Sequence, residues 1–145
     1  MILPDVNVLV YAFRREAVRH EAYAGWLTQV INGTEELALY DPVLSGFLRV
    51  VTNPRIMSDP APTRTALDFV AALRGADRAR WIASGHQSWE VLGRFVDGDK
   101  AIRGNLVPDA QLASTAVAHG ARLATADRGF ARFPGLRSFD PAADA

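Results

Sequence analysis

Four aspartates occupy positions from which their carboxylates could act together on a metal ion. Three of them follow apolar stretches typical of short strands: Asp5 after ILP, Asp41 after ALY and Asp127 at the end of ARLATAD. The fourth, Asp109, opens a predicted helix after a polar loop that contains glycine. Carboxylates that converge repel one another unless a cation lies between them, and an all-oxygen site suits Mg²⁺ or Mn²⁺. The pattern therefore predicts a divalent-metal site.

Each of these aspartates also has a structural interpretation. An aspartate at a helix start accepts hydrogen bonds from free backbone N–H groups and favours the positive end of the helix dipole. Asp41 and Asp140, each followed by proline, are the most typical of caps and turns. Asn7, two residues after Asp5, could orient that carboxylate, contact a phosphate or make a local backbone bond. It is the grouping of the acids that favours chemistry over capping.

Other kinds of site find little support in the sequence. There is no cysteine, so disulfides and thiolate metal sites are excluded, and the three histidines show no HExxH spacing. Phosphate-cradling and serine-hydrolase motifs are absent. The net charge is zero, and no apolar run approaches the roughly 20 residues that cross a bilayer. We therefore expect a soluble, cytoplasmic protein with no membrane partner, whose polyanion binding, if any, uses a local patch.

The elements that must position these acids alternate along the chain. Apolar stretches predict strands over residues 2–4, 36–40, 79–84, 121–127 and 136–139. Helical spacing and end signals predict helices over 6–13, 20–32, 42–52, 63–74 (with Thr63 as the cap), 88–96 and 108–120. This alternation indicates a single α/β domain, 1–145, around a mostly parallel sheet. Ligands of such sheets bind beyond the carboxyl ends of the strands, where three of the aspartates stand.

Four segments carry a resemblance to a known family: DVNVLVYA, SGFLRVVTNPR, GNLVPDAQLASTAVAHG and TADRGFARFPGLR, in this order. Together they resemble the PIN-domain ribonucleases, and more narrowly the VapC toxins of type II toxin–antitoxin systems. The resemblance runs from Asp5 to about Pro141, nearly the whole chain. It implies a three-layer α/β/α sandwich with a mostly parallel central sheet, in agreement with the alternation of strands and helices.

The resemblance also assigns roles to individual residues. Asp5, Asp109 and Asp127 match three of the family's acids and would be both catalytic and metal-binding. The family's glutamate in the helix after the second strand is replaced by Gly46, so Asp41 is a candidate substitute ligand beside its capping interpretation. The position two after Asp127, often acidic in relatives, is glycine as well. The expected substrate-binding residues are Asn7, Ser45, Arg49 and Arg128.

The activity implied is that of an endoribonuclease dependent on Mg²⁺ (or Mn²⁺) that cleaves structured RNA, tRNA or rRNA, by metal-activated water. A VapB antitoxin and a second copy of the chain, as a homodimer, are the implied partners. The alternative is a catalytically degraded PIN fold that binds RNA or a partner without cutting, and Gly46 is the residue that supports it. Phosphatases with an aspartyl nucleophile are disfavoured because Asn7 stands where they carry a second aspartate.

Overall fold

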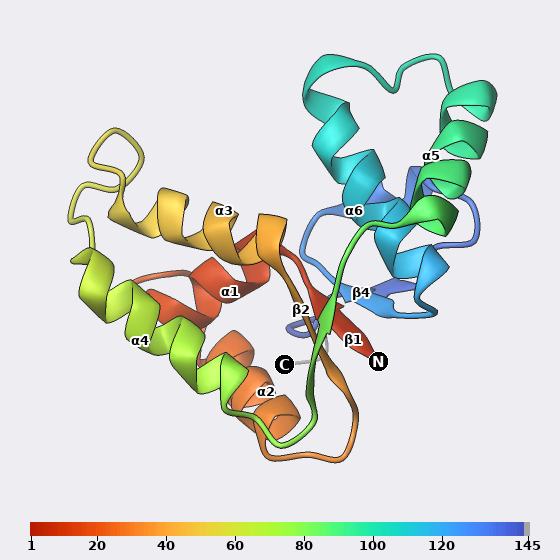
Figure 1. Cartoon of the computed structure of the whole chain (residues 1–145). Helices are drawn as coiled ribbons and strands as arrows, with labels where there is room; N and C mark the ends of the chain where they lie inside the picture. Colours follow the sequence, from red (N-terminus) through yellow and green to blue (C-terminus); the bar gives the residue numbers. More distant parts are fainter. Residues whose placement is uncertain (144–145) are drawn as a thin grey trace.

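Five strands form one parallel sheet in the computed structural model, which describes residues 1–143 (Figure 1). The strands are β1 (Ile2–Pro4), β2 (Leu37–Tyr40), β3 (Ala79–Ile82), β4 (Arg122–Ala124) and β5 (Ser138–Phe139). Their order across the sheet is β3-β2-β1-β4-β5, and every neighbouring pair is parallel. The chain moves outward from β1 to β3 and then returns to the other side of β1. The sheet therefore has a topological switch point between β1 and β4.

Six α-helices cover the two faces of this sheet. They are α1 (Val6–Phe13), α2 (His20–Ile31), α3 (Asp41–Thr52), α4 (Thr63–Arg74), α5 (His86–Gly98) and α6 (Val107–Ala118), with short 3-10 helices at Gly104–Leu106 and Arg128–Arg132. Figure 1 shows α1 to α4 on one side of the strands and α5 with α6 on the other. Right-handed crossovers produce this division, because the chain changes direction after β3. The predicted three-layer α/β/α sandwich is confirmed.

The core lies where the helices meet the central strands. Leu3 of β1 and Leu123 of β4 are completely buried, as expected for parallel strands covered on both faces. On the α1–α4 side, the ring of Phe47 stacks on that of Phe69, with 4.9 Å between the ring centroids. It also packs against the ring of Phe13 in a T-shaped arrangement, with 5.3 Å between the centroids. These contacts join α1, α3 and α4 into one layer.

Several element boundaries differ from those predicted. Thr63 is the first residue of α4 and not its cap, since Pro62 precedes the helix without a capping side-chain bond. The strand predicted to end at Asp127 stops at Ala124, and Asp127 instead caps the 3-10 helix that follows. Helix α5 begins at His86, two residues before the predicted start at residue 88. The sheet is thus shorter at its carboxyl edge than the apolar pattern suggests.

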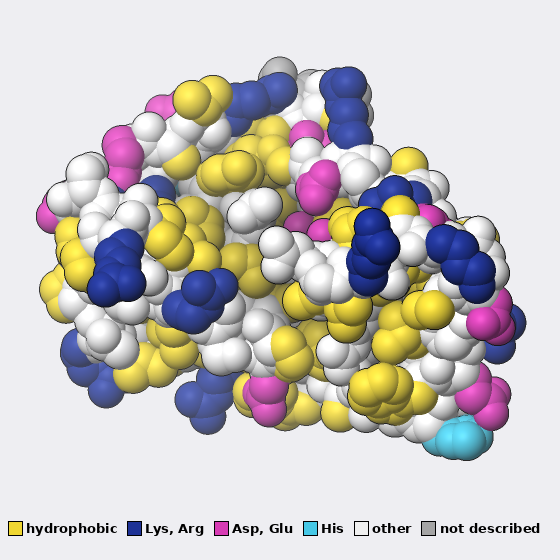
Figure 2. All heavy atoms as spheres, turned by 90° about the horizontal axis from the view of Figure 1, so that it is seen from above, with side chains coloured by type: hydrophobic (Ala, Val, Ile, Leu, Met, Phe, Trp, Pro, Cys, Tyr) yellow, Lys and Arg dark blue, Asp and Glu magenta, His cyan; other side chains and the backbone are white. Residues whose placement is uncertain are grey.

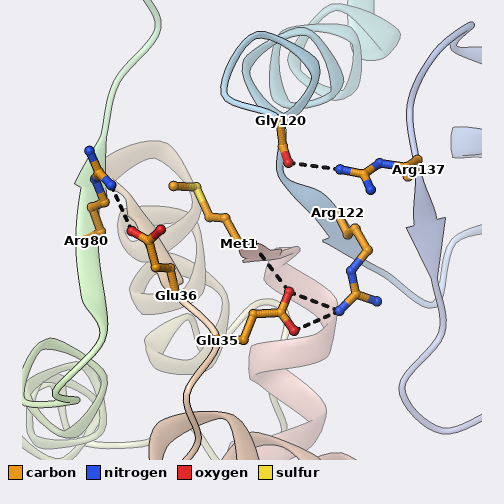
Figure 3. A network of polar contacts seen from close by, with 7 residues as sticks. All are labelled: Met1, Glu35, Glu36, Arg80, Gly120, Arg122 and Arg137. Carbon is orange, nitrogen blue, oxygen red and sulfur yellow. Dashed lines mark hydrogen bonds and ion pairs between the residues drawn. The ribbon is translucent and has the colours of Figure 1, made fainter.

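At the opposite edge, ion pairs tie the strand beginnings together (Figure 3). The carboxylate of Glu35 lies 3.4 Å from the amino group of Met1 and 2.9 Å from the guanidinium of Arg122, which also lies over the ring of Phe139. Arg80 of β3 pairs with Glu36 at 2.9 Å. This edge is thus held by charge pairs. Within the described residues, no helix is long and apolar enough to cross a membrane.

Candidate active site

Asp5 is the most buried acid of the predicted site, with 8% of its surface exposed. One carboxylate oxygen, Oδ1, accepts a hydrogen bond from the Val6 N–H at 2.7 Å and caps α1. The other, Oδ2, accepts one from the Thr125 hydroxyl at 2.8 Å. Burial raises the pKa of Asp5, the two hydrogen bonds oppose that rise, and the charge of Asp127 adds to it. The capping interpretation is therefore correct. Burial disfavours the ionised form of the Asp5 carboxyl, and the two hydrogen bonds offset part of that cost.

The switch point places Asp5 beside the end of β4. The Asp5 N–H donates to the Ala124 carbonyl at 2.9 Å, so the carboxyl ends of β1 and β4 lie side by side. Thr125, itself buried, donates to Asp5 and accepts from the Asp127 N–H at 3.0 Å. This threonine was not among the predicted site residues. The sequence signal for it was a hydroxyl residue two positions before a predicted ligand.

Asp127 is exposed and oriented by local backbone. Its Oδ1 accepts a hydrogen bond from the Gly129 N–H at 2.7 Å. Through this bond Asp127 caps the 3-10 helix Arg128–Arg132. A Cβ at position 129 would lie only 3.0 Å from the same oxygen, tighter than most Cβ contacts. Gly129 thus accommodates this turn.

Asp109 completes the group from the first turn of α6, on the other side of the sheet. Its carboxyl is half-buried, and burial, then the charge of Asp5, then that of Asp127 raise its pKa. Each of the three carboxylates therefore lies within electrostatic reach of the other two. The predicted grouping of Asp5, Asp109 and Asp127 at one end of the sheet agrees with this geometry.

A cavity of about 140 Å³ opens beside Asp5 and Asp109. Its walls are Asp5, Val6, Tyr40, Pro42, Val43, Pro108, Asp109, Gln111 and Leu112. Figure 2 looks onto this end of the sheet: acidic side chains are visible near the middle of the face, with arginine or lysine side chains on several sides of them. Asp5 and Asp109 thus border a partly open cavity with mostly apolar walls.

The chemistry of these side chains fits a hard divalent cation. The donors are carboxylate oxygens, which Mg²⁺ and Mn²⁺ prefer, and their mutual repulsion is the kind that a cation relieves. In residues 1–143, however, no three histidine, cysteine or acidic side chains already enclose a position for an ion. Mg²⁺ also keeps several water ligands and needs only one or two carboxylates. Asp5 and Asp109 are the pair that could supply them.

Position 46 of helix α3 is sterically restricted. At Gly46 a Cβ would lie 3.1 Å from Val6 Cγ2, because α3 passes close to α1 there. The helix begins at Asp41 with Tyr40 as its cap residue, and the exposed Asp41 carboxylate accepts no hydrogen bond from the described residues. The interpretation of Asp41 as a hydrogen-bonding cap is wrong. Asp41 is not among the walls of the cavity, and its role as a substitute ligand stays a prediction.

The four predicted substrate-binding residues are all exposed: Asn7, Ser45, Arg49 and Arg128. The Ser45 hydroxyl donates to the Asp41 carbonyl at 3.0 Å. Within the described part of the chain, the side chains of the other three form no hydrogen bond or ion pair. Arg128 is therefore not a counter-ion held by the acids in this structure. These residues do not line the cavity, and their contact with substrate stays a prediction.

Comparison with known proteins identifies the family. The PIN domain family matches residues 2–136. The ribonuclease VapC43 of Mycobacterium tuberculosis is 42% identical over 137 residues, which are 94% of this chain and 92% of the relative. Ribonuclease VapC33 of the same species is 30% identical over 141 residues, 97% of this chain and 98% of that one.

Solved structures agree at the level of the fold. The VapBC2 complex of Rickettsia felis, bound to a DNA fragment from its promoter, matches with a TM-score of 0.70 and 22% identity over 97% of this chain and 98% of that chain. VapC20 of Mycobacterium tuberculosis, described as a sarcin-ricin loop cleaving toxin, matches with a TM-score of 0.65 and 14% identity over 94% and 99%.

Proposed function

The chain belongs to the PIN domain family, and within it we propose that this protein is the toxin of a VapBC toxin–antitoxin pair, acting as a metal-dependent endoribonuclease. One observation carries the proposal: three carboxylates from β1, α6 and the segment after β4 share an electrostatic environment at the switch point of the sheet. The VapC ribonucleases of the comparisons match over nearly the whole chain, which supports the same class of activity.

Asp5 and Asp109 would hold Mg²⁺ (or Mn²⁺), with Asp127 contributing directly or through water. When bound, the ion lowers the pKa of a water molecule and neutralises charge that builds on the phosphate. The chain's own residues supply the positioning: Thr125 and the Val6 N–H fix the two oxygens of Asp5, and the Gly129 N–H fixes Asp127. Arg49 and Arg128, exposed and without ion pairs among residues 1–143, would contact the RNA backbone.

The substrate we propose is structured RNA, such as tRNA or an rRNA loop, and the partners are a VapB antitoxin and a second copy of this chain. The relatives support this: VapC20 is described as cleaving the sarcin-ricin loop, and VapBC2 was solved as a complex. We further propose that one PIN domain spans residues 1–145 and acts in the cytoplasm.

A second candidate function is RNA or partner binding without cleavage. Gly46 favours it, because this helix position lacks the carboxylate that the family usually has, and the close approach of Val6 leaves little room for one. The two candidates differ in a single observable, which is cleavage that depends on Asp5.

The deciding experiment expresses the wild type and the Asp5→Asn, Asp109→Asn and Asp41→Asn variants in cells without an antitoxin gene. We expect the wild type to arrest growth and to create new RNA 5′ ends, and the first two variants to do neither. Full activity of Asp41→Asn would remove Asp41 from the site. If the folded wild type produces no new RNA ends, or if Asp5→Asn cleaves as the wild type does, the endoribonuclease proposal fails.

A further inference from the structure

The cavity beside Asp5 and Asp109 has a composition that metal binding does not explain. Val6, Pro42, Val43, Pro108 and Leu112 give it apolar walls, and the side chain of Tyr40 lies among them. Its volume of about 140 Å³ is well below the roughly 300 Å³ at which pockets for drug-sized ligands begin. A space of this size and character takes one small apolar or aromatic group.

Besides the two acids, two residues with polar side-chain groups line this space, Tyr40 and Gln111, and Gln111 lies two residues after Asp109. Its Nε2 makes one long hydrogen bond, 3.5 Å to the Ser84 hydroxyl. Its amide oxygen accepts no hydrogen bond from residues 1–143, and one of its two N–H groups is also left over. A half-buried amide thus keeps one acceptor and one donor for a ligand.

A cluster of hydroxyl groups lies next to this amide. The Ser84 Oγ lies 2.7 Å from the Tyr40 hydroxyl and 2.8 Å from the Thr115 hydroxyl. These three side chains come from β2, the segment after β3, and α6. The cluster therefore joins the sheet to α6, and Gln111 meets it through one long hydrogen bond.

We propose that this cavity binds a single unstacked nucleobase of the RNA next to the cleaved phosphate, with Gln111 reading the edge of the base. Proteins that recognise RNA splay single bases out of the stack and hydrogen-bond their edges, and an amide that offers one donor and one acceptor side by side matches the edge of a base. A phosphate does not suit the apolar walls, and beside Asp5 and Asp109 it would depend on the proposed metal ion to offset their charge.

The inference rests on the proposed function, since it assumes that RNA is the substrate. It adds a specificity-determining residue: Gln111 selects which nucleotide lies beside the metal ligands. The uncharged, flat character of a base fits apolar walls that would not favour a sugar or a phosphate alone.

The test uses nucleosides, which carry no phosphate for the acids to repel. The ¹⁵N-labelled protein is titrated with adenosine, cytidine, guanosine or uridine, and with ribose as the control without a base. The side-chain amide signal of Gln111, assigned by its loss in Gln111→Leu, is expected to shift with at least one nucleoside and not with ribose. Gln111→Leu should weaken that binding by roughly 2- to 10-fold, the effect of one lost hydrogen bond. Gln87→Leu, at an exposed glutamine of α5, is the matched control and should bind as the wild type does.

Three results would overturn the proposal: ribose shifts the Gln111 signal as nucleosides do, no nucleoside shifts it, or Gln111→Leu binds like Gln87→Leu. These outcomes are independent of cleavage. If Asp5→Asn were found to cleave RNA like the wild type, the endoribonuclease proposal would fall while the nucleoside titration still stood as evidence of a base pocket. Conversely, a wild type that cleaves RNA in an Asp5-dependent way but binds no nucleoside here would leave only the base pocket refuted.

Discussion

Thr125 donates its hydroxyl hydrogen to Oδ2 of Asp5 at 2.8 Å, joining residues that are 120 positions apart in the sequence. The same hydroxyl oxygen accepts from the Asp127 N–H at 3.0 Å. One threonine therefore fixes the side chain of one proposed metal ligand and the backbone of another.

Replacing Thr125 by valine should destabilise the protein by about 1–3 kcal/mol at neutral pH. Valine keeps the shape but leaves the buried Asp5 oxygen and the Asp127 N–H without their partner, and an unsatisfied buried group costs about that much. Urea unfolding of the wild type, Thr125→Val and Thr125→Ser measures the effect. Thr125→Ser retains the hydroxyl and should keep most of the stability. A loss in Thr125→Ser that is absent in Thr125→Val, which keeps the methyl group, would instead assign the effect to packing of that methyl group.

Removing the charge of Asp109 should stabilise the protein when divalent ions are absent. Asp109 is repelled by Asp5 and Asp127, so Asp109→Asn in EDTA should unfold a few degrees higher than the wild type. With Mg²⁺ added, the wild type should unfold at a higher temperature than Asp109→Asn. A ligand that binds only the folded state stabilises it more the tighter it binds, and the variant lacks one proposed metal ligand. Thermal unfolding with EDTA and with Mg²⁺ checks both. Asp68→Asn, at an exposed residue of α4, should show neither change.

The side chain of Val6 should determine how Gly46→Ala changes the free energy of unfolding. Alanine at a helix interior is favoured over glycine by about 1 kcal/mol, but here its Cβ would lie 3.1 Å from Val6 Cγ2. We expect Gly46→Ala to be close to neutral alone and stabilising in a Val6→Ala background, with a favourable coupling of about 1 kcal/mol. A double-mutant cycle by urea unfolding measures it. Additive effects would mean that α1 and α3 separate at no cost.

Glu35 should give stability that depends on pH and salt. Burial disfavours its charge, but Arg122 and the amino group of Met1 outweigh burial and lower the pKa of Glu35. Its contribution is therefore present above the usual glutamate pKa of about 4.3 and is lost as the pH falls through the lowered folded-state value.

The side chain of Glu35 is 41% exposed, so screening limits the contribution to about 1 kcal/mol or less. Urea unfolding of Glu35→Gln between pH 3 and 7 measures it, with the unpaired, exposed Glu21→Gln as the control. A difference from the wild type that persists unchanged at low pH or at high salt would contradict the ion-pair explanation.

Alternation of apolar strands and amphipathic helices was sufficient to predict the layers, because the local period of burial follows from secondary structure alone. It also drew attention to Asp5, Asp109 and Asp127. Asp5 and Asp127 stand at the ends of predicted strands and Asp109 opens a predicted helix, and ligands of parallel sheets bind at the carboxyl ends of the strands. Thr125 and Gln111 were missed because their roles depend on contacts with Asp5 and Ser84, distant in the sequence. The steric reason for Gly46 was equally hidden, as the approach of α3 to Val6 is a property of helix crossing and not of either helix.

The placement of β4 beside β1 has a consequence for when the proposed site is completed during synthesis. Asp5 is among the first residues made, yet the Ala124 carbonyl and the Thr125 hydroxyl that hold it come from the last fifth of the chain. A nascent or truncated chain that lacks β4 has Asp5 and its local contact with the Val6 N–H, but not the contacts with Ala124 and Thr125. The proposed catalytic site is in this sense completed late in synthesis, and the proposed antitoxin would need to meet only finished molecules.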